Sequence, residues 1–492
     1  MNEAVKRLAR VGPSLLLLGI ALGVRVAVFL TMHPVVHTDS ITFLFLSELD
    51  MVRTPGYPLF IELVLSLNDL LGLSVDHLRA IVFGQLFILG MLNVFLLYDI
   101  TRSLTRSRGF AWVMGVLYNL NFFVLGFEIQ LMTETLTVTL LFAFLALYLR
   151  LFRGKKSIAC LAGLIMVLLI YTRATYLLFW IFLPLITWVA FFPAAKRRRF
   201  LAAYWPAAVV FLLVCVLGIG AWAVRNKIKF DYLGISSLMP YQLRYYTNAL
   251  FAKYRPSGDM LLDRVAEVYA QEFQETGHSS VTVYNFHVRL NRELGLSDAQ
   301  IASAFMKVQL RLIRDYPREY LRQIPSSLAS YYRQYKSYWT AGNTRKFLGP
   351  SDGLSVLFLR FFQFYQRLFL SVPWLLWMLV ASPLLVLALS FRDREAFHGW
   401  LIVEAVVHYT AFVSVLSTNA GINNLRYRQP VEPLILLVFY AGFFLSARTV
   451  IRWMRRSGPE GSEPSNQDRS CLISQSETEG EVKIPRINSP QT

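Results

Sequence analysis

The sequence predicts an all-α polytopic membrane protein with about ten transmembrane helices. Its 492 residues are 55% hydrophobic and only 16% charged, with a mean hydropathy of +0.45, a composition outside the range of soluble globular chains. The apolar residues gather into stretches of about 20, the length that crosses the hydrocarbon core as a helix. The net charge is +18, but the Lys and Arg residues lie between the apolar stretches, where they orient helices and meet anionic lipids. The composition therefore indicates membrane lipids as partners and excludes nucleic acid.

Ten apolar stretches are predicted to span the membrane. They lie near residues 12–32, 79–100, 109–127, 131–149, 157–172, 174–193, 202–224, 368–390, 400–418 and 430–447. The first stretch is full length and no small-residue cleavage site follows it, so we expect it to remain as an anchor rather than to be removed as a signal peptide.

The short loops predict the orientation of these spans. Basic residues occupy the N-terminus, every second loop and the residues after the last span, and the charge rule makes that side cytoplasmic. The opposite loop, residues 33–76, has six acidic residues and a single basic residue, Arg53. We therefore expect a multi-pass protein of the inner (plasma) membrane with this first loop outside. The basic residues are Lys6, Arg7, Arg10, Arg102, Arg106, Arg108, Arg153, Lys155, Lys156, those at 196–199, Arg392, Arg394, Arg452, Arg455 and Arg456.

The chain is predicted to have four parts. Residues 1–225 form an N-terminal transmembrane module whose first outer loop is 33–78, and residues 226–353 form a long, mostly helical extracytoplasmic segment with helices near 259–276 and 298–315. Residues 354–456 form a C-terminal transmembrane module. Residues 457–492 are rich in Ser, Glu, Pro and Gln, which predicts a disordered cytoplasmic tail. Three cysteines, in two apolar stretches and the tail, indicate no disulfide framework; they are Cys160, Cys215 and Cys471.

The first outer loop is predicted to contain interfacial helices around a stiff turn. Apolar residues recur at helical spacing from Asp39 to Arg53, the pattern of a helix lying in the head-group layer. Asp39 would begin this helix, where a carboxylate is also explained by capping of free N–H groups and by the helix dipole. Pro55 and Pro58 stiffen the turn and can return Arg53 toward the start of the loop.

Five short motifs occur in the order seen in membrane glycosyltransferases of the C type (GT-C). They are Asp39-Ser40, Arg53-Thr-Pro-Gly-Tyr-Pro-Leu-Phe60, Thr133-Glu-Thr135, Tyr171-Thr-Arg-Ala174 and Leu425-Arg-Tyr-Arg-Gln-Pro430. Over residues 12–447 the chain resembles the bacterial relatives of dolichyl-phosphate-mannose protein mannosyltransferases and lipid A aminoarabinose transferases. It departs from them at one position, because Ser40 stands where better studied members usually have a second acid.

The resemblance implies an enzyme that moves a hexosyl or pentosyl group from a polyprenyl phosphate, with inversion, to an acceptor hydroxyl of a protein, lipid or glycan on the outer face. The acceptor must lose a proton as the new bond forms. An aspartate with an ordinary pKa of about 3.9 is ionised at neutral pH, which makes Asp39 the candidate base. Guanidinium groups neutralise a leaving phosphate by two-pronged hydrogen bonds. The candidates for the phosphate are Arg53, Arg173, Arg426 and Arg428, and those for substrate contacts are Tyr57, Glu134 and Tyr427.

Most of these positions also have a structural explanation. Arg426 and Arg428 are also explained as interface residues that snorkel, and Glu134 by its place at the start of an apolar helix. Arg173 lies at a membrane boundary, and Arg25 lies in the middle of the first span. Charged residues in such places usually have a partner, so we expect Arg25 either to pair inside the bundle or to bind a phosphate there.

We expect no cofactor, although a divalent metal stays open as the less favoured alternative. His33, His37 and Asp39 lie within seven residues and have the donor types of a metal site. However, no fourth ligand is evident, and a monophosphate donor lacks the diphosphate that commonly recruits a cation.

Two other functions fit the same membrane setting. One is an envelope polysaccharide polymerase or ligase with a lipid-diphosphate donor, for which the pattern from Asp39 to Phe60 is less expected. The other is a non-enzymatic transporter. Transporters place charged residues in broken helices of two matching halves, and the sequence has no duplicated half.

Overall fold

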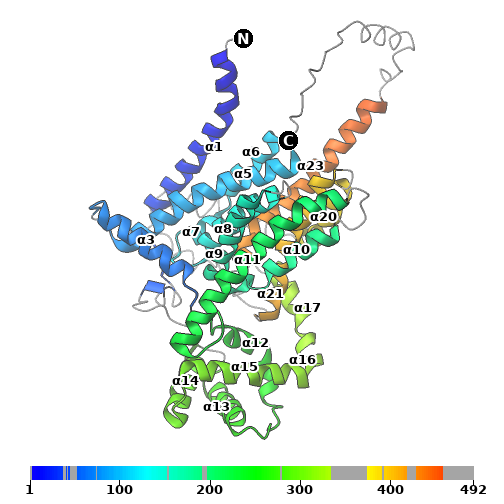
Figure 1. Ribbon diagram of the computed structural model, residues 1–492. Coiled ribbons are helices and arrows are strands. Elements are labelled where there is room, and N and C mark those ends of the chain that lie inside the picture. The colour runs from blue at the N-terminus through cyan, green and yellow to red at the C-terminus, as the bar shows by residue number, and fades with distance from the viewer. Residues whose placement is uncertain are drawn as a thin grey trace, which may run out of the picture. The chain divides into compact units, whose positions relative to one another are not determined.

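A computed structural model describes residues 3–36, 40, 43–44, 53–73, 75–151, 155–190, 197–277, 280–333, 374–390, 393–417 and 428–457 (Figure 1). Over these residues the regular structure is helical except for one parallel β-bridge, between Val35 and Gln130. The all-α class predicted from the sequence is confirmed.

Six helical stretches in the described ranges are long and apolar enough to cross a membrane. They are Pro13–Thr31, His77–Thr105, Glu134–Leu151, Tyr204–Phe230, Ala396–Leu416 and Gln429–Arg452. Shorter apolar helices occupy Lys156–Thr172 and Ala174–Thr187. The protein is therefore an all-α membrane protein, and the count of ten spans stays a prediction.

The N-terminal half of the chain forms a helical bundle. Its helix α9 packs between α8 and α11, while α5 packs against α6 and α8. In the apolar stretch of α8, 78% of the residues are buried inside the protein, whereas in those of α1 and α11 only 22% are. A helix that is apolar on all sides is either buried or faces lipid. The elements are α1 (Glu3–Thr31), α3 (Gly56–Leu70), α4 (His77–Phe83), the π-helix η1 (Gly84–Gly90), α5 (Met91–Thr105), α6 (Arg108–Asn119), α7 (Phe122–Glu128), α8 (Glu134–Leu151), α9 (Lys156–Thr172), the 3₁₀-helix η2 (Ala174–Tyr176), α10 (Phe179–Ala190) and α11 (Arg197–Phe230).

The stretch 109–127, expected as one span, is divided into α6 and α7. The side chain of Asn121 accepts hydrogen bonds from the backbone N–H groups of Phe123 and Val124, at 3.1 and 3.3 Å, and so caps a new helix. With 12 residues, α6 rises only about 18 Å, which is short of a hydrocarbon core of about 30 Å. An asparagine inside the apolar stretch marks the break.

Residues 239–333 form a set of polar-faced helices that we call the helical insert. Its helices α13 and α15 confirm those predicted near 259–276 and 298–315. An aromatic core that includes Phe251, Tyr269 and Phe305 holds these helices together. The insert packs through α12 and α17 against α21 (Arg394–Ser417). Its elements are α12 (Met239–Phe251), α13 (Met260–Thr276), α14 (Ser280–Leu294), α15 (Asp298–Asp315), α16 (Pro317–Arg322) and α17 (Ile324–Arg333).

The C-terminal part contains α20 (Trp374–Ser390), α21 (Arg394–Ser417), the 3₁₀-helix η4 (Gln429–Val431) and α23 (Glu432–Ser457). Helix α21 packs against α10 and α20, and η4 packs against α8. By its internal contacts the chain separates into two compact units, residues 1–442 and 443–492. The domain boundaries near 225, 353 and 456 stay predictions.

Candidate functional site

The turn that begins at Arg53 packs closely against the end of α9. The hydroxyl of Thr54 donates a hydrogen bond to the carbonyl of Thr172 at 3.1 Å. A Cβ atom at Gly56 would lie 2.5 Å from the side-chain oxygen of Thr172 and 2.7 Å from its backbone nitrogen. Because these distances are too short for any side chain, glycine is required for this approach. Two of the predicted motifs are therefore in direct contact.

The guanidinium of Arg53 folds back over an earlier part of the loop. It lies 5.0 Å from the centre of the Phe43 ring, within the range of a cation–π interaction. The ring of Phe43 in turn meets Tyr57 edge to face at 5.2 Å. The turn thus returns Arg53 toward the start of the loop, as its prolines predicted. The binding of donor phosphate by Arg53 stays a prediction.

Tyr57 is completely buried, and its hydroxyl donates a hydrogen bond to Gln85 at 2.8 Å. Burial raises the pKa of this phenol well above its ordinary value, and the charge of Glu134 raises it further. The phenol therefore stays protonated and acts as a donor at neutral pH. A substrate contact by Tyr57 stays a prediction, whereas its structural role as a link to Gln85 is directly visible.

Arg173, which directly follows α9, forms an ion pair with Glu134, the first residue of α8. Their charged atoms are 3.7 Å apart, with 11% of the Arg173 side chain exposed and none of the Glu134 side chain. The partner expected for a boundary arginine is thus the acid of the motif Thr133-Glu-Thr135. Arg173 also lines a narrow pocket together with Tyr176 and Tyr409. It is the charged residue of that lining.

Arg428 is buried and bound internally. Its Nε atom donates to Glu432 at 2.6 Å, and Nη1 donates to the carbonyl of Tyr331 at 3.3 Å. Sequence reasoning gave no sign of these two partners. The predicted role of Arg428 at a donor phosphate would have to coexist with this ion pair. Four other predicted residues lie outside the described ranges: His37, Asp39, Arg426 and Tyr427.

Arg25 pairs inside the bundle, which confirms the first of the two alternatives considered for it. Its guanidinium donates to the Glu128 carboxylate at 2.9 Å, to the Asn119 side chain at 2.6 Å and to the Gly90 carbonyl at 3.0 Å. Arg25 and Glu128 are both fully buried. Position 90 requires a glycine, because a Cβ atom there would lie 2.5 Å from Nε of Arg25.

Sequence reasoning missed Asn119 and Glu128, which bind Arg25, and Gln85, which donates to the carbonyl of Glu128. Asn119, Gln85 and Glu128 lie in or beside apolar stretches, where a buried polar residue normally has a hydrogen-bond partner. Their polar character within apolar sequence indicated that each has a hydrogen-bond partner, but nothing in their spacing identified which residue each one binds.

The described residues contain no cluster of three or more His, Cys, Asp or Glu side chains that could hold a metal. His33 is described, whereas its proposed fellow ligands His37 and Asp39 are not. Metal independence therefore stays a prediction.

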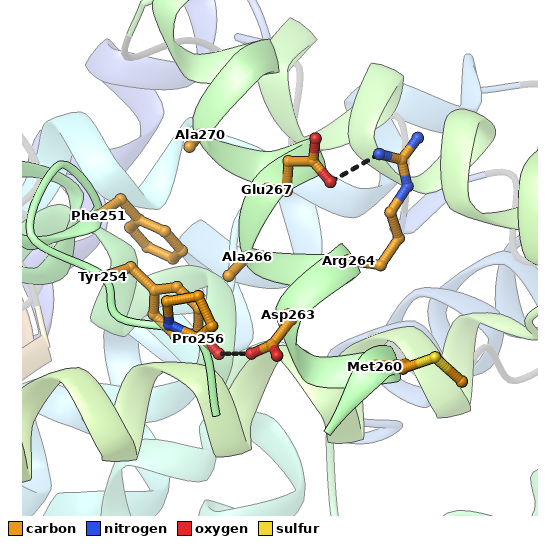
Figure 2. A pocket seen from close by; sticks show the side chains of 9 residues that line it. All are labelled: Phe251, Tyr254, Pro256, Met260, Asp263, Arg264, Ala266, Glu267 and Ala270. Carbon is orange, nitrogen blue, oxygen red and sulfur yellow. Dashed lines mark hydrogen bonds and ion pairs between the residues drawn. The ribbon is translucent and has the colours of Figure 1, made fainter. Parts of the chain in front are cut away.

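A pocket of about 540 Å³ lies in the helical insert, and none of the residues that line it is a predicted site residue (Figure 2). Its charged side chains are bound by other residues of the insert. Arg264 donates to Glu267 at 2.7 Å, and Asp263 accepts from the Ser257 N–H at 2.6 Å and from the Tyr254 hydroxyl at 2.8 Å. These hydrogen bonds, led by the Ser257 N–H, lower the pKa of Asp263 to about 2. Its carboxylate stabilises the turn before α13.

No protein-family model matches the chain, and no curated protein matches it. Solved structures of oligosaccharyltransferases are among those similar to it. One is the archaeal oligosaccharyltransferase AglB from Archaeoglobus fulgidus in complex with an inhibitory peptide and a dolichol-phosphate, with 14% identity and a TM-score of 0.40 over 86% of this chain and 46% of that chain. Another is an Archaeoglobus fulgidus oligosaccharyltransferase tethered to an acceptor peptide containing the NVT sequon, with 13% identity and a TM-score of 0.41 over 86% of this chain and 45% of that chain.

The chain therefore spans less than half the length of either similar structure. A likeness of this degree does not establish a shared activity, so the function must be argued from the residues of the chain itself.

Proposed function

We propose that the protein is a GT-C glycosyltransferase that moves a sugar from a polyprenyl-phosphate donor to an acceptor hydroxyl on the outer face of the plasma membrane. The sugar is a hexose or a pentose, and the acceptor is a protein, a lipid or a glycan. The cytoplasmic position of the C-terminal tail belongs to the same proposal.

One observation carries the proposal: motifs distant in the sequence meet at one place. Thr54 bonds to Thr172, and the next residue after Thr172 is Arg173, which pairs with Glu134. A close approach at Gly56 holds the turn there. This arrangement supports a common site built from the first outer loop and the ends of α8 and α9.

In the proposed reaction Asp39 removes the proton of the acceptor hydroxyl while its oxygen attacks the anomeric carbon. The bond between that carbon and the phosphate oxygen breaks, and the lipid phosphate leaves with its electron pair. A single displacement of this kind inverts the anomeric configuration. Arginines neutralise the charge that develops on the phosphate.

The decisive experiment uses the purified full chain in lipid nanodiscs with a polyprenyl-phosphate sugar and cell-envelope acceptors. The proposal expects a product whose mass increases by one sugar residue. Reaction only with a lipid diphosphate would indicate a polymerase or ligase instead, and uptake into vesicles without chemistry would indicate a transporter.

Arginine-to-lysine changes test the contacts to the donor phosphate. If at least two of the four arginines bind the phosphate, Arg173→Lys and one or more of the changes at Arg53, Arg426 and Arg428 should lower donor affinity by roughly tenfold or more. A lysine gives one point charge in place of a planar pair of donors, and a hydrogen bond to a charged group contributes about 1.5–3 kcal/mol. Donor affinity of each variant is measured by titration in nanodiscs.

Arg225→Lys is the matched control, because the guanidinium of Arg225 stacks on Trp222 at 4.5 Å. It should leave donor affinity unchanged. Thermal unfolding of Arg428→Lys must be recorded alongside, since this residue also pairs with Glu432. If all four lysine variants bind the donor with the wild-type affinity, the arginines are structural or interface residues and do not bind the phosphate.

Transfer should need no added divalent metal. A monophosphate donor can be neutralised by arginines alone, and Ser40 stands where the relatives usually have a second acid. Treatment with a chelator should leave the rate unchanged, and the double variant His33→Ala with His37→Ala should transfer at close to the wild-type rate. Loss of transfer on chelation, with recovery on adding back one cation, would contradict this expectation.

A further inference from the structure

We infer that Gln85 is a positioning residue for the proposed transfer, because its amide links two segments of the first outer loop, at Val35 and at Tyr57, that precede and follow Asp39 in the sequence. The inference rests on the proposed function for its catalytic meaning. The link itself stands on the hydrogen bonds of the described residues.

The first segment, at Val35, lies beside residues 129–131. The N–H of Val35 donates to the carbonyl of Ile129 at 3.1 Å, and the N–H of Leu131 donates to the carbonyl of Val35 at 3.0 Å. Val35 precedes Asp39 by four residues. This β-bridge therefore fixes the chain a short distance before the candidate base.

The second segment is the turn that ends in Tyr57, after Asp39 in the sequence. The hydroxyl of Tyr57 donates to Oε1 of Gln85, while Nε2 of Gln85 donates to the carbonyls of Glu128 and Gln130, each at 2.9 Å. One of these carbonyls belongs to Gln130, the bridge partner of Val35. One buried side chain thus contacts both the turn at Tyr57 and the residues that hold the chain at Val35.

The chemistry of the amide fits this position in one orientation only. Two carbonyl oxygens only accept hydrogen bonds, so they require the NH₂ group, which leaves the amide oxygen to accept from the hydroxyl of Tyr57. Gln85 is fully buried, so each lost hydrogen bond would leave a buried polar group without its partner.

The far side of the link is itself held in place. Glu128, whose carbonyl accepts from Gln85, has its side chain bound to Arg25 and to the hydroxyl of Tyr118, at 2.9 and 3.3 Å. The carbonyl of Glu128 is therefore held by the same residue whose side chain is fixed in the bundle. Reacting groups must be held within about 1 Å, since a misplacement of that size can cost roughly 100-fold in rate.

Two variants test the link, with Gln309→Met as the matched control. Gln85→Met removes all three hydrogen bonds at similar size, and Gln85→Glu keeps the acceptor for Tyr57 but turns an oxygen toward the two carbonyls. Gln309 is likewise fully buried and donates to a backbone carbonyl, that of Pro240 in the helical insert. Gln309→Met thus has the same kind of loss away from the loop.

Hydrogen exchange and steady-state kinetics are measured on the full-length chain in nanodiscs. Both Gln85 variants should speed amide exchange at least tenfold in peptides containing Val35 and Leu131. They should also lower kcat by tenfold or more while KM for the polyprenyl-phosphate sugar changes less than threefold. Gln309→Met should change neither the exchange of these peptides nor kcat.

Unchanged exchange at Val35 in both variants would overturn the link. Faster exchange with an unchanged kcat would overturn the positioning role. If the wild-type protein transfers no sugar, the proposed function fails and the positioning role with it, while the exchange data still decide whether Gln85 joins the two segments.

Discussion

Asp39→Asn is expected to lower the rate of sugar transfer by about two to four orders of magnitude, the usual contribution of a general base. The amide has nearly the size of the carboxylate and still caps a helix N-terminus, so the protein should fold. It cannot take the proton of the acceptor hydroxyl. Turnover is measured under saturating donor, with thermal unfolding of the same preparation.

Asp76→Asn is the matched control within the same outer loop. Asp76 is the N-cap of α4, where it accepts a hydrogen bond from the N–H of Arg79 at 3.2 Å. Its change to asparagine also preserves capping and should leave turnover near the wild-type value. Near-normal turnover of Asp39→Asn would reduce Asp39 to a helix cap.

Arg25→Met is expected to lower the free energy of unfolding by about 3–5 kcal/mol, the cost of breaking a buried ion pair by removing one partner. The change leaves the Glu128 carboxylate buried without its cation. It also removes the donors that serve Asn119 and Gly90. Unfolding is followed by circular dichroism during titration with a denaturing detergent.

The control for Arg25 is Arg150→Met. Arg150 pairs with Asp99 at 2.6 Å, but both side chains are more than one-third exposed, so water screens the pair and its loss should cost no more than about 1 kcal/mol. The double variant Arg25→Met with Glu128→Gln should regain part of the stability, since it removes the unpaired charge. Equal losses for Arg25→Met and Arg150→Met would show that burial of the first pair has no energetic weight.

Hydrophobic periodicity predicted the helices well but not where they are interrupted. The helices at 259–276 and 298–315 follow from their amphipathic patterns, because apolar residues that recur with the period of a helix mark both the helix and its buried face. The division of 109–127 at Asn121 was missed, since an average over an apolar stretch hides one capping residue. The π-helix Gly84–Gly90 was also missed, because hydrophobic periodicity does not distinguish it from the α-helix on either side.

At the candidate site the sequence indicated which arginines need a partner but not which residue that partner is. The sequence indicated that Arg25 and Arg173 need partners, because charges in or at a membrane are costly when alone. It did not identify Glu128 and Glu134 as those partners. A contact between distant segments depends on how helices pack, and no local pattern carries that information.

The π-helix Gly84–Gly90 lets one membrane helix serve two sets of neighbours. Each π-type hydrogen bond reaches back five residues instead of four, so the turn accommodates an additional residue. One residue corresponds to about 100° of rotation in an α-helix. The side of α4 that faces α3 and the sides of α5 that face α6 and α8 are therefore out of phase with each other. Deleting one residue here would make the helix more regular, but it would turn one of its halves away from its neighbours.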